Sequence, residues 1–309
     1  MRLFAFAVAA LATALAGVAG MPGAGATASA PPAVATQAPP LLVAAGDLAC
    51  PAYLPRTATR CHHAAIAALA GRLRPTAVAL LGDLQYNRGT LSEFRGSFAP
   101  TWGRLGARLR PAPGNHEYAP PGAAGYYSYF GARAGPSRRG YYSFDVGEWH
   151  VVSLNSNCTV VACRPGSAQV RWLRADLAAH RNRCVLAYWH HPRFSSGVTG
   201  PFPIVAPFWS ELYRAGADVV LNGHEHSYER FAPLSPTGRL DPMRGIRQFV
   251  VGTGGVEQRR FLTPKPGSLR RSTGTFGVLA LTLRPAGYSW RFVPEPGRSF
   301  TDSGSAACR

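Results

Sequence analysis

The chain has 309 residues, of which 46% are apolar and 11% aromatic, a composition that can build a core and excludes a disordered basic tail. Its 33 Lys and Arg residues against 15 Asp and Glu residues give a formal net charge of +18, and Lys265 is the only lysine. The arginine excess has two open explanations. It reflects either a coding bias, which the abundant alanine, glycine and proline favour, or attraction to phosphate groups, which guanidinium binds bidentately.

The amino-terminal residues read as a targeting segment. Arg2 precedes an apolar run over residues 3–20, and small residues follow at 26–30, an order that predicts a secretory signal peptide over residues 1–30. An uncleaved membrane anchor is the alternative, although the alanine and glycine content makes the run a poor anchor. The Pro- and Ala-rich residues 31–40 predict an extended linker. We therefore expect a protein that is secreted or lies in the cell envelope, without stable membrane insertion.

Residues 41–309 are predicted to form a single domain, in which short apolar runs are followed directly by polar residues. The runs are 41–46 before Asp47, 76–82 before Asp83, 184–189 before His190, and 218–221 before Asn222. Continuous apolar runs of this length are typical of strands buried on both faces, as in a parallel sheet.

Amphipathic patterns with the helical period occupy residues 66–73, 170–177 and 205–212. The segments 141–155 and 277–293 each contain two strand-like runs around a turn and predict β-hairpins. Strands that alternate with helices indicate an α/β protein with antiparallel additions.

Ligands of such sheets collect at the carboxyl ends of the strands, so we expect loops distant in sequence to converge on one site. The glycine-rich residues 252–255 predict a strand-end turn beside that site. The tyrosines at 126, 127 and 129 form either a wall of the site or ordinary aromatic packing.

The cysteines form an even set without a C-x-x-C pair, which argues against a zinc–thiolate site and for disulfides in an oxidising compartment. Pairing of near neighbours predicts Cys50–Cys61 and Cys158–Cys163, and leaves Cys184 to hold the carboxyl-terminal tail at Cys308. This is one of several possible connectivities.

The strand-end residues have the chemistry of a metal centre. Carboxylates, imidazoles, an amide oxygen and a phenolate can together hold two hard or borderline cations, with one carboxylate bridging them. Each motif alone is weak, because Gly-Asp after a strand is usually a turn. Their joint occurrence in order points to a site, and its candidate residues are Asp47, Asp83, Tyr86, Asn115, His116, His190, His224 and His226.

The motifs Gly46-Asp47, Gly-Asp-Leu-Gln-Tyr at 82–86, Gly-Asn-His-Glu at 114–117, His190, and Gly-His-Glu-His at 223–226 resemble the calcineurin-like metallophosphoesterase superfamily. Asp47 is followed by Leu48 and Ala49 rather than by the Asp-x-His of many members, and Tyr86 would fill the missing position. That pattern is similar to the purple acid phosphatase-like branch, including secreted bacterial phosphatases. The resemblance implies an α/β four-layer sandwich of two mixed β-sheets flanked by helices, with disulfides.

The resemblance also implies a ligand set. The first metal, expected to be Fe(III), would be held by Asp47, Asp83, Tyr86 and His226. The second, a divalent ion of zinc, iron or manganese, would be held by Asp83, Asn115, His190 and His224. His116 matches the family's proton donor or transition-state stabiliser.

Other residues near these motifs are weighed as supporting groups. His191 is expected in a supporting or structural role beside His190. Glu117, Glu225 and Glu229 are candidate acceptors for imidazole N–H groups, with a solvated charge as the alternative. Three arginines lie close to the motifs: Arg88, Arg193 and Arg230. Each either contacts a substrate phosphate or is a plain surface charge.

The expected function is hydrolysis of phosphomonoesters by attack of a metal-bound hydroxide on phosphorus. The alternative is a phosphodiesterase or nuclease with the same metal site, which the positive charge favours. A noncatalytic phosphate-binding envelope protein is a third hypothesis. We expect a small phosphate ester as the partner and no specific nucleic acid, because no aromatic-basic nucleic-acid module is evident. The oligomeric state stays open.

Overall fold

The computed structural model describes residues 14, 16–17, 38–180 and 184–309. The predicted signal peptide and linker, 1–30 and 31–40, therefore lie almost entirely outside the described residues. Residues Ala38–Arg309 form one unit. Among the described residues, no helix combines the length and hydropathy needed to cross a bilayer.

The first of two mixed sheets has six strands in the order β13-β12-β11-β1-β2-β3. In chain order its strands are β1 Leu41–Ala45, β2 Ala77–Leu81, β3 Leu109–Ala112, β11 Gly277–Arg284, β12 Gly287–Pro294 and β13 Ser303–Ala307. Strands β1, β2 and β3 run parallel, whereas β11, β12 and β13 are antiparallel additions.

The second sheet has seven strands in the order β10-β8-β9-β7-β6-β5-β4. In chain order they are β4 Tyr142–Val146, β5 Trp149–Ser153, β6 Cys184–Tyr188, β7 Val219–Asn222, β8 Tyr228–Phe231, β9 Arg247–Val251 and β10 Ser268–Ser272. Four of these strands run parallel, namely β5, β6, β7 and β9. The continuous apolar runs of β6 and β7 predicted this parallel arrangement.

The two sheets pack face to face, and helices cover their outer faces. In β1, Leu42 and Ala44 lie in the apolar cluster between the sheets, whereas Val43 and Ala45 lie in the cluster that includes helix α1. Because successive side chains of a strand point to opposite faces, a strand buried on both faces has no polar position, which explains the unbroken run.

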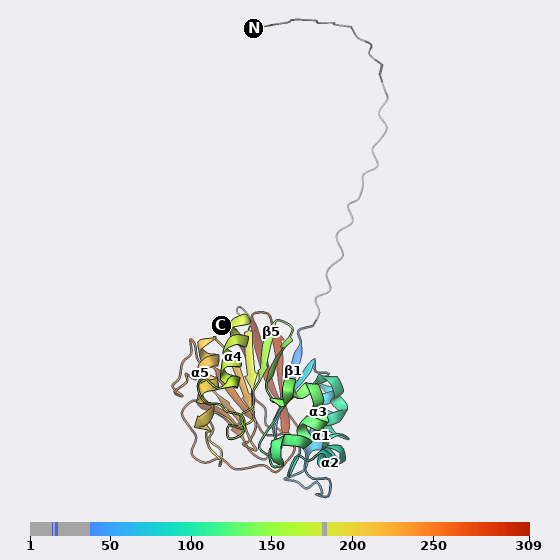
Figure 1. Ribbon diagram of the computed structural model, residues 1–309. Helices are drawn as coiled ribbons and strands as arrows, with labels where there is room; N and C mark the ends of the chain where they lie inside the picture. The colour runs from blue at the N-terminus through green and yellow to red at the C-terminus, as the bar shows by residue number, and fades with distance from the viewer. Residues whose placement is uncertain (1–13, 15, 18–37, 181–183) are drawn as a thin grey trace. The chain divides into compact units, whose positions relative to one another are not determined.

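Figure 1 shows the helices as the outer layers, with α4 and α5 on one side and α1, α2 and α3 on the other. Their bounds are α1 His63–Arg72, α2 Leu91–Glu93, α3 Ala124–Phe130, α4 Ala168–Ala179 and α5 Ala206–Arg214. The side chain of Ser167 caps α4 by accepting the Val170 N–H. The predicted four-layer α/β sandwich is therefore confirmed.

Both predicted hairpins form, as β4–β5 and β11–β12. The aromatic segment near residue 126 contains helix α3. Tyr126 and Tyr127 belong to this helix, and their side chains are buried in the core. The Tyr126 hydroxyl donates to the Pro111 carbonyl oxygen at 3.1 Å. Aromatic packing, not a substrate wall, is their role.

All the cysteines are paired, and the three disulfides are those predicted. They join Cys50 to Cys61, Cys158 to Cys163, and Cys184 to Cys308. The last one fastens the carboxyl-terminal tail to the first residue of β6.

Candidate metal centre

The candidate ligands come from loops at the carboxyl ends of parallel strands in both sheets. Asp47 follows β1, Asp83 follows β2, and His190 and His224 follow β6 and β7. Asp47, Asp83 and His224 have φ angles of 60°, 49° and 72°. Such left-handed conformations are uncommon for residues with a Cβ and cluster at functional sites, where the surrounding packing enforces them. Each turns the chain sharply as the strand ends.

One group of side chains surrounds the Tyr86 hydroxyl. Its oxygen lies 3.0 Å from Asp47 Oδ1, 3.1 Å from Asp83 Oδ2 and 3.2 Å from His226 Nε2. Asp47 and Asp83 are buried, as are Tyr86 and His226. The structure thus brings together the four residues that the resemblance assigned to the first metal.

A second group surrounds His190. Its Nε2 lies 3.1 Å from Asp83 Oδ2, 3.1 Å from Asn115 Oδ1 and 3.2 Å from His224 Nδ1. These are the residues expected on the second metal, and Asp83 belongs to both groups. His190 is fully buried, whereas Asn115 is exposed and His224 is half-buried. The second group is therefore the side of the centre that opens to solvent.

The donor set fits a pair of metal ions. Burial raises the pKa of Tyr86 well above its usual value, and the charges of Asp47 and Asp83 raise it further. Two carboxylates and a phenolate packed this closely need cations among them before all three can be ionised. Nitrogen and oxygen donors in this mixture suit iron, zinc or manganese.

The imidazole rings are oriented by main-chain carbonyl groups. His190 Nδ1 lies 2.9 Å from the Leu81 oxygen, and His226 Nδ1 lies 2.8 Å from the Glu257 oxygen. A ring N–H that donates to such an acceptor leaves the other nitrogen, Nε2, with a lone pair directed into the site.

Glu117 supports the site in a way that differs from the prediction. It contacts backbone rather than imidazole N–H groups: Oε2 accepts from Asp83 at 3.0 Å and from Gly114 at 2.7 Å. Its Oε1 accepts from Leu84 at 2.9 Å and from Gln85 at 3.2 Å. Burial and the charge of Asp83 raise the pKa of Glu117 to about 8, against the hydrogen bonds from the backbone. The glutamate joins two ligand loops.

The other two glutamates also bind loops rather than metal-ligand imidazoles. Glu229 accepts the Ser196 N–H at 2.9 Å and the Ser268 hydroxyl. Glu225, which lies between His224 and His226 in sequence, accepts the Gly200 N–H at 2.7 Å. The expected imidazole contacts of these carboxylates are therefore wrong.

His116 lies at the edge of the centre and is partly open. Its backbone N–H donates to Asp83 Oδ1 at 2.9 Å. The centroid of its ring lies 4.1 Å from that of Tyr86, and its side chain is 27% exposed. His116 Nδ1 lies 2.5 Å from the Asn87 carbonyl oxygen, and Nε2 lies 3.8 Å from Asp83 Oδ2. The position suits a residue that meets a substrate.

His191 is buried behind the second group. Its Nδ1 lies 2.8 Å from the Ser156 hydroxyl oxygen, and its ring stacks on Phe202 at 4.5 Å. Burial lowers its pKa well below the usual value, with a further contribution from His190. Ligand atoms of His190, His191 and His224 all lie within 4.8 Å of one another, so geometry leaves His191 as a further candidate ligand.

The three candidate arginines differ. Arg230 is committed to Asp302 through Nε at 2.6 Å and Nη2 at 3.0 Å, so the structure contradicts its assignment to substrate phosphate. Arg193 lies over the Phe194 ring at 4.7 Å and donates to the Pro236 carbonyl oxygen at 3.3 Å. Arg88 is exposed and stays a candidate.

Glycines allow the ligand loops to approach one another. A Cβ on Gly114 would lie 2.2 Å from Asp83 Oδ1, and one on Gly252 would lie 2.7 Å from Asp47 Oδ2. The predicted strand-end turn at 252–255 therefore does lie beside the centre.

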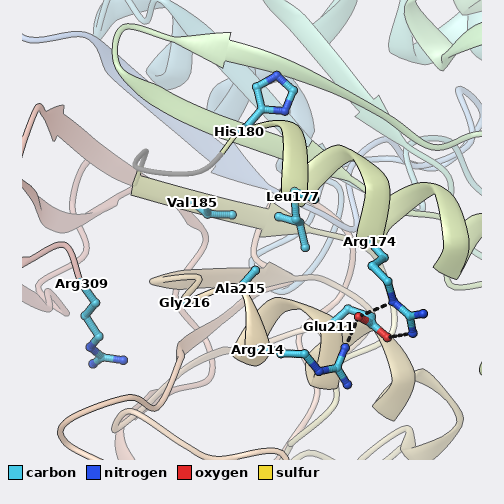
Figure 2. Close-up of a pocket in the computed structure, with 10 residues that line it drawn as sticks. Arg174, Leu177, His180, Val185, Glu211, Arg214, Ala215, Gly216 and Arg309 are labelled. Atoms are coloured by element: carbon cyan, nitrogen blue, oxygen red, sulfur yellow. Dashed lines mark hydrogen bonds and ion pairs between the residues drawn. The ribbon is translucent and has the colours of Figure 1, made fainter.

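A cavity of about 840 Å³ lies apart from these ligands and contains none of them. It is lined by α4, α5 and the tail residue Arg309, and Figure 2 shows Glu211 paired with Arg174 and Arg214 at its edge. The candidate chemistry is thus at the strand ends, not in this cavity.

The chain is similar in sequence to known proteins. Residues 41–228 match the calcineurin-like phosphoesterase family. Purple acid phosphatase 15 of Arabidopsis thaliana is 29% identical over 60% of this chain and 41% of its own length. An uncharacterized protein of Mycobacterium tuberculosis is 30% identical over 52% of this chain and 38% of its own length. This chain thus spans about two-fifths of the length of these relatives.

Solved structures agree on the fold. A purple acid phosphatase from yellow lupin seeds superposes with a TM-score of 0.74 at 18% identity, covering 87% of this chain and 53% of that one. GAP50 of Plasmodium, described as the anchor in the inner membrane complex, gives 0.67 at 12% identity, covering 88% and 90%. With the family match over more than half of its length, the chain belongs to the calcineurin-like metallophosphoesterase family and is purple acid phosphatase-like.

Proposed function

We propose that this protein is a secreted phosphomonoesterase whose centre holds Fe(III) and a divalent ion of zinc, iron or manganese. The observation that carries the proposal is the position of the Tyr86 hydroxyl, within 3.2 Å of Asp47, Asp83 and His226. A phenolate among carboxylates is a hard donor suited to a trivalent ion, whereas the imidazole-rich group around His190 suits a divalent one.

When bound, two such ions supply Lewis acidity and lower the pKa of a water molecule that can then attack phosphorus. The protein's own task is to hold the donors and exclude competing arrangements. Asp83 is shared by both groups, so its carboxylate sets the spacing between them. Glu117 holds the backbone of Asp83 against that of Gly114, which keeps the bridge and the Asn115 loop in register.

His116 is the residue that we assign to the leaving group. Its Nδ1 donates to the Asn87 carbonyl and Nε2 faces the centre, so the imidazolium form, which carries a proton on both nitrogens, can give the Nε2 proton to the departing alkoxide oxygen. The partial exposure of His116 and the open position of Asn115 leave room for an ester to approach from the same side.

Two features support a small anionic ester and an extracytoplasmic location. The formal net charge of +18 attracts anions without requiring a nucleic acid. Three disulfides suit an oxidising compartment, as does the signal-peptide pattern at residues 1–30. Mass analysis of protein recovered from the culture medium tests secretion, with cleavage expected close to residue 30.

Parallel assays with p-nitrophenyl phosphate and bis(p-nitrophenyl) phosphate test the reaction. We expect the monoester to be strongly preferred. Asp83→Asn should abolish activity, whereas His191→Ala should retain more of it, with a loss of about 10- to 100-fold typical of residues that orient ligands. A strong preference for the diester would establish the phosphodiesterase alternative, and a greater loss in His191→Ala would reverse the roles of the paired histidines.

Metal analysis with visible spectroscopy tests the iron assignment separately. Fe(III) bound by a tyrosinate should give a charge-transfer colour, and Tyr86→Phe should lose it while the other ligands remain. A colourless, fully active zinc enzyme would refute Fe(III) without affecting the assignment of a hydrolase.

A further inference from the structure

A second group of metal-binding side chains lies between β5 and α4, outside the centre described above. It consists of His150 on β5, Asp176 on α4, and His180, which directly follows the last residue of α4. One ligand atom from each lies within 4.8 Å of the others. We propose that this cluster is a binding site for Zn²⁺.

The fold places the three residues together for reasons of helix and strand geometry. Asp176 and His180 are four residues apart, the spacing at which side chains share one helix face. That face covers His150, whose side chain is only 1% exposed, while those of Asp176 and His180 are 11% and 33% exposed. Two imidazoles and a carboxylate form a common protein donor set for zinc, with water as the fourth ligand.

The surrounding hydrogen bonds resemble those that orient metal ligands. His150 Nδ1 lies 3.2 Å from Asp145 Oδ1, and His180 Nδ1 lies 2.7 Å from the Asp176 main-chain oxygen. The Ser143 hydroxyl donates to Asp176 Oδ1 at 2.7 Å. Metal-ligating histidines characteristically donate their second ring N–H to a carboxylate or a main-chain carbonyl, and ligating carboxylates are themselves hydrogen-bonded.

A proton and the metal compete for the same position. His150 Nε2 lies 2.8 Å from Asp176 Oδ2, so the imidazole bridges two carboxylates. Burial opposes its protonation, but hydrogen bonds and charges of Asp176 and Asp145 outweigh burial and raise the pKa of His150. Zinc binding therefore replaces the proton on Nε2 and releases it to solvent.

Binding also requires one small rearrangement. The rings of His150 and His180 are stacked, with centroids 3.7 Å apart and planes 11° apart, whereas ligands of one ion point their nitrogens toward a common point. His150 is held between sheet and helix, so His180 is the ring that tilts. Figure 2 shows His180 at the end of α4; it is among the residues that line the 840 Å³ cavity, and its side chain is 33% exposed.

Isothermal titration of the metal-loaded enzyme with Zn²⁺ tests the site. The metal content is measured before and after, so that uptake is counted beyond what the catalytic centre holds. We expect one additional equivalent and the release of about one proton near neutral pH, read from the dependence of the binding heat on buffer. Absence of an additional equivalent in the wild-type protein overturns the proposal.

Variants identify the ligands. His180→Ala and Asp176→Asn should each weaken zinc uptake by at least about 10-fold, while phosphatase activity and the metal content of the catalytic centre stay unchanged. His63→Ala, which removes a partly exposed histidine elsewhere, is the matched control and should keep the additional equivalent. Undiminished uptake in both cluster variants would place the zinc elsewhere and refute the assignment.

Discussion

The carboxylate of Glu117 accepts the backbone N–H of Asp83 at 3.0 Å, although the two residues are 34 positions apart. The same oxygen accepts from Gly114, whose neighbour Asn115 contacts His190. One buried side chain therefore sets the relative position of the two loops that carry the bridging carboxylate and the amide ligand.

Replacement of this carboxylate by an amide should damage both stability and activity. The amide oxygen of Glu117→Gln can face only two of the four backbone donors, and its NH₂ group would oppose the others. We expect a loss of about 2–4 kcal/mol in the free energy of unfolding, together with a large fall in kcat. Chemical denaturation measures the first, and Glu148→Gln at an exposed turn serves as the control. Equal stability of the two variants would show that the backbone contacts are not required.

A methyl group at Gly114 should displace the bridge. The Cβ would lie 2.2 Å from Asp83 Oδ1 and 2.3 Å from Asp83 N, whereas on Gly96 it would meet only the Ala52 Cβ at 3.9 Å. Gly114→Ala should therefore lose metal and activity and be destabilised by about 1–3 kcal/mol. Gly96→Ala is expected to retain both. Metal content and monoester hydrolysis compare the pair, and full activity of Gly114→Ala would contradict the packing argument.

The disulfides should stabilise the protein to different extents. Cys184–Cys308 closes a loop of 124 positions, and Cys158–Cys163 one of 5. Loop-closure entropy then predicts losses of about 5 and about 2 kcal/mol, respectively, when each pair is replaced by alanine. Denaturant unfolding of the two double variants measures the difference. A larger effect from the shorter loop would mean that contacts of the cystines, rather than chain entropy, dominate.

Ionisation of Asp218 should lower the free energy of unfolding of the protein as the pH rises. Burial raises its pKa from 3.8 to about 6, against hydrogen bonds from the N–H groups of Val185 and Arg309. The folded protein thus binds this proton more tightly than the unfolded chain does. The stabilisation that the proton provides is therefore complete at pH values below the unfolded pKa of 3.8, and it is lost as the pH rises through the folded pKa of about 6.

The stability of the wild type relative to Asp218→Asn should accordingly fall by roughly 2 kcal/mol between pH 4 and pH 7. Taking the difference cancels the other titrating groups and any pH-independent cost of the amide. Unfolding free energies of both proteins across that range provide the measurement. A difference that is constant with pH, or that grows with it, would contradict the raised pKa.

The sequence patterns by themselves determined the α/β class and most of the donor set, whereas the four-layer sandwich was what the family resemblance implied. Strands buried on both faces leave unbroken apolar runs, and in β1, β2, β6 and β7 the residues after those runs are the candidate ligands. Both signals are local, because side-chain alternation in a strand and the polarity of its carboxyl end depend on neighbouring residues. The disulfide pairing followed from spacing for the same reason in Cys50–Cys61 and Cys158–Cys163.

The tertiary structure alone decided how the supporting charges are used. Arg230 follows a ligand motif but pairs with Asp302, 72 positions away, and Glu117 binds backbone donors of another loop instead of imidazoles. His150 and Asp176 likewise meet only because α4 packs over β5. These roles depend on distances between segments that are remote in sequence. A buried charge takes whichever partner the packing brings within hydrogen-bond reach, since burial without a partner is too costly.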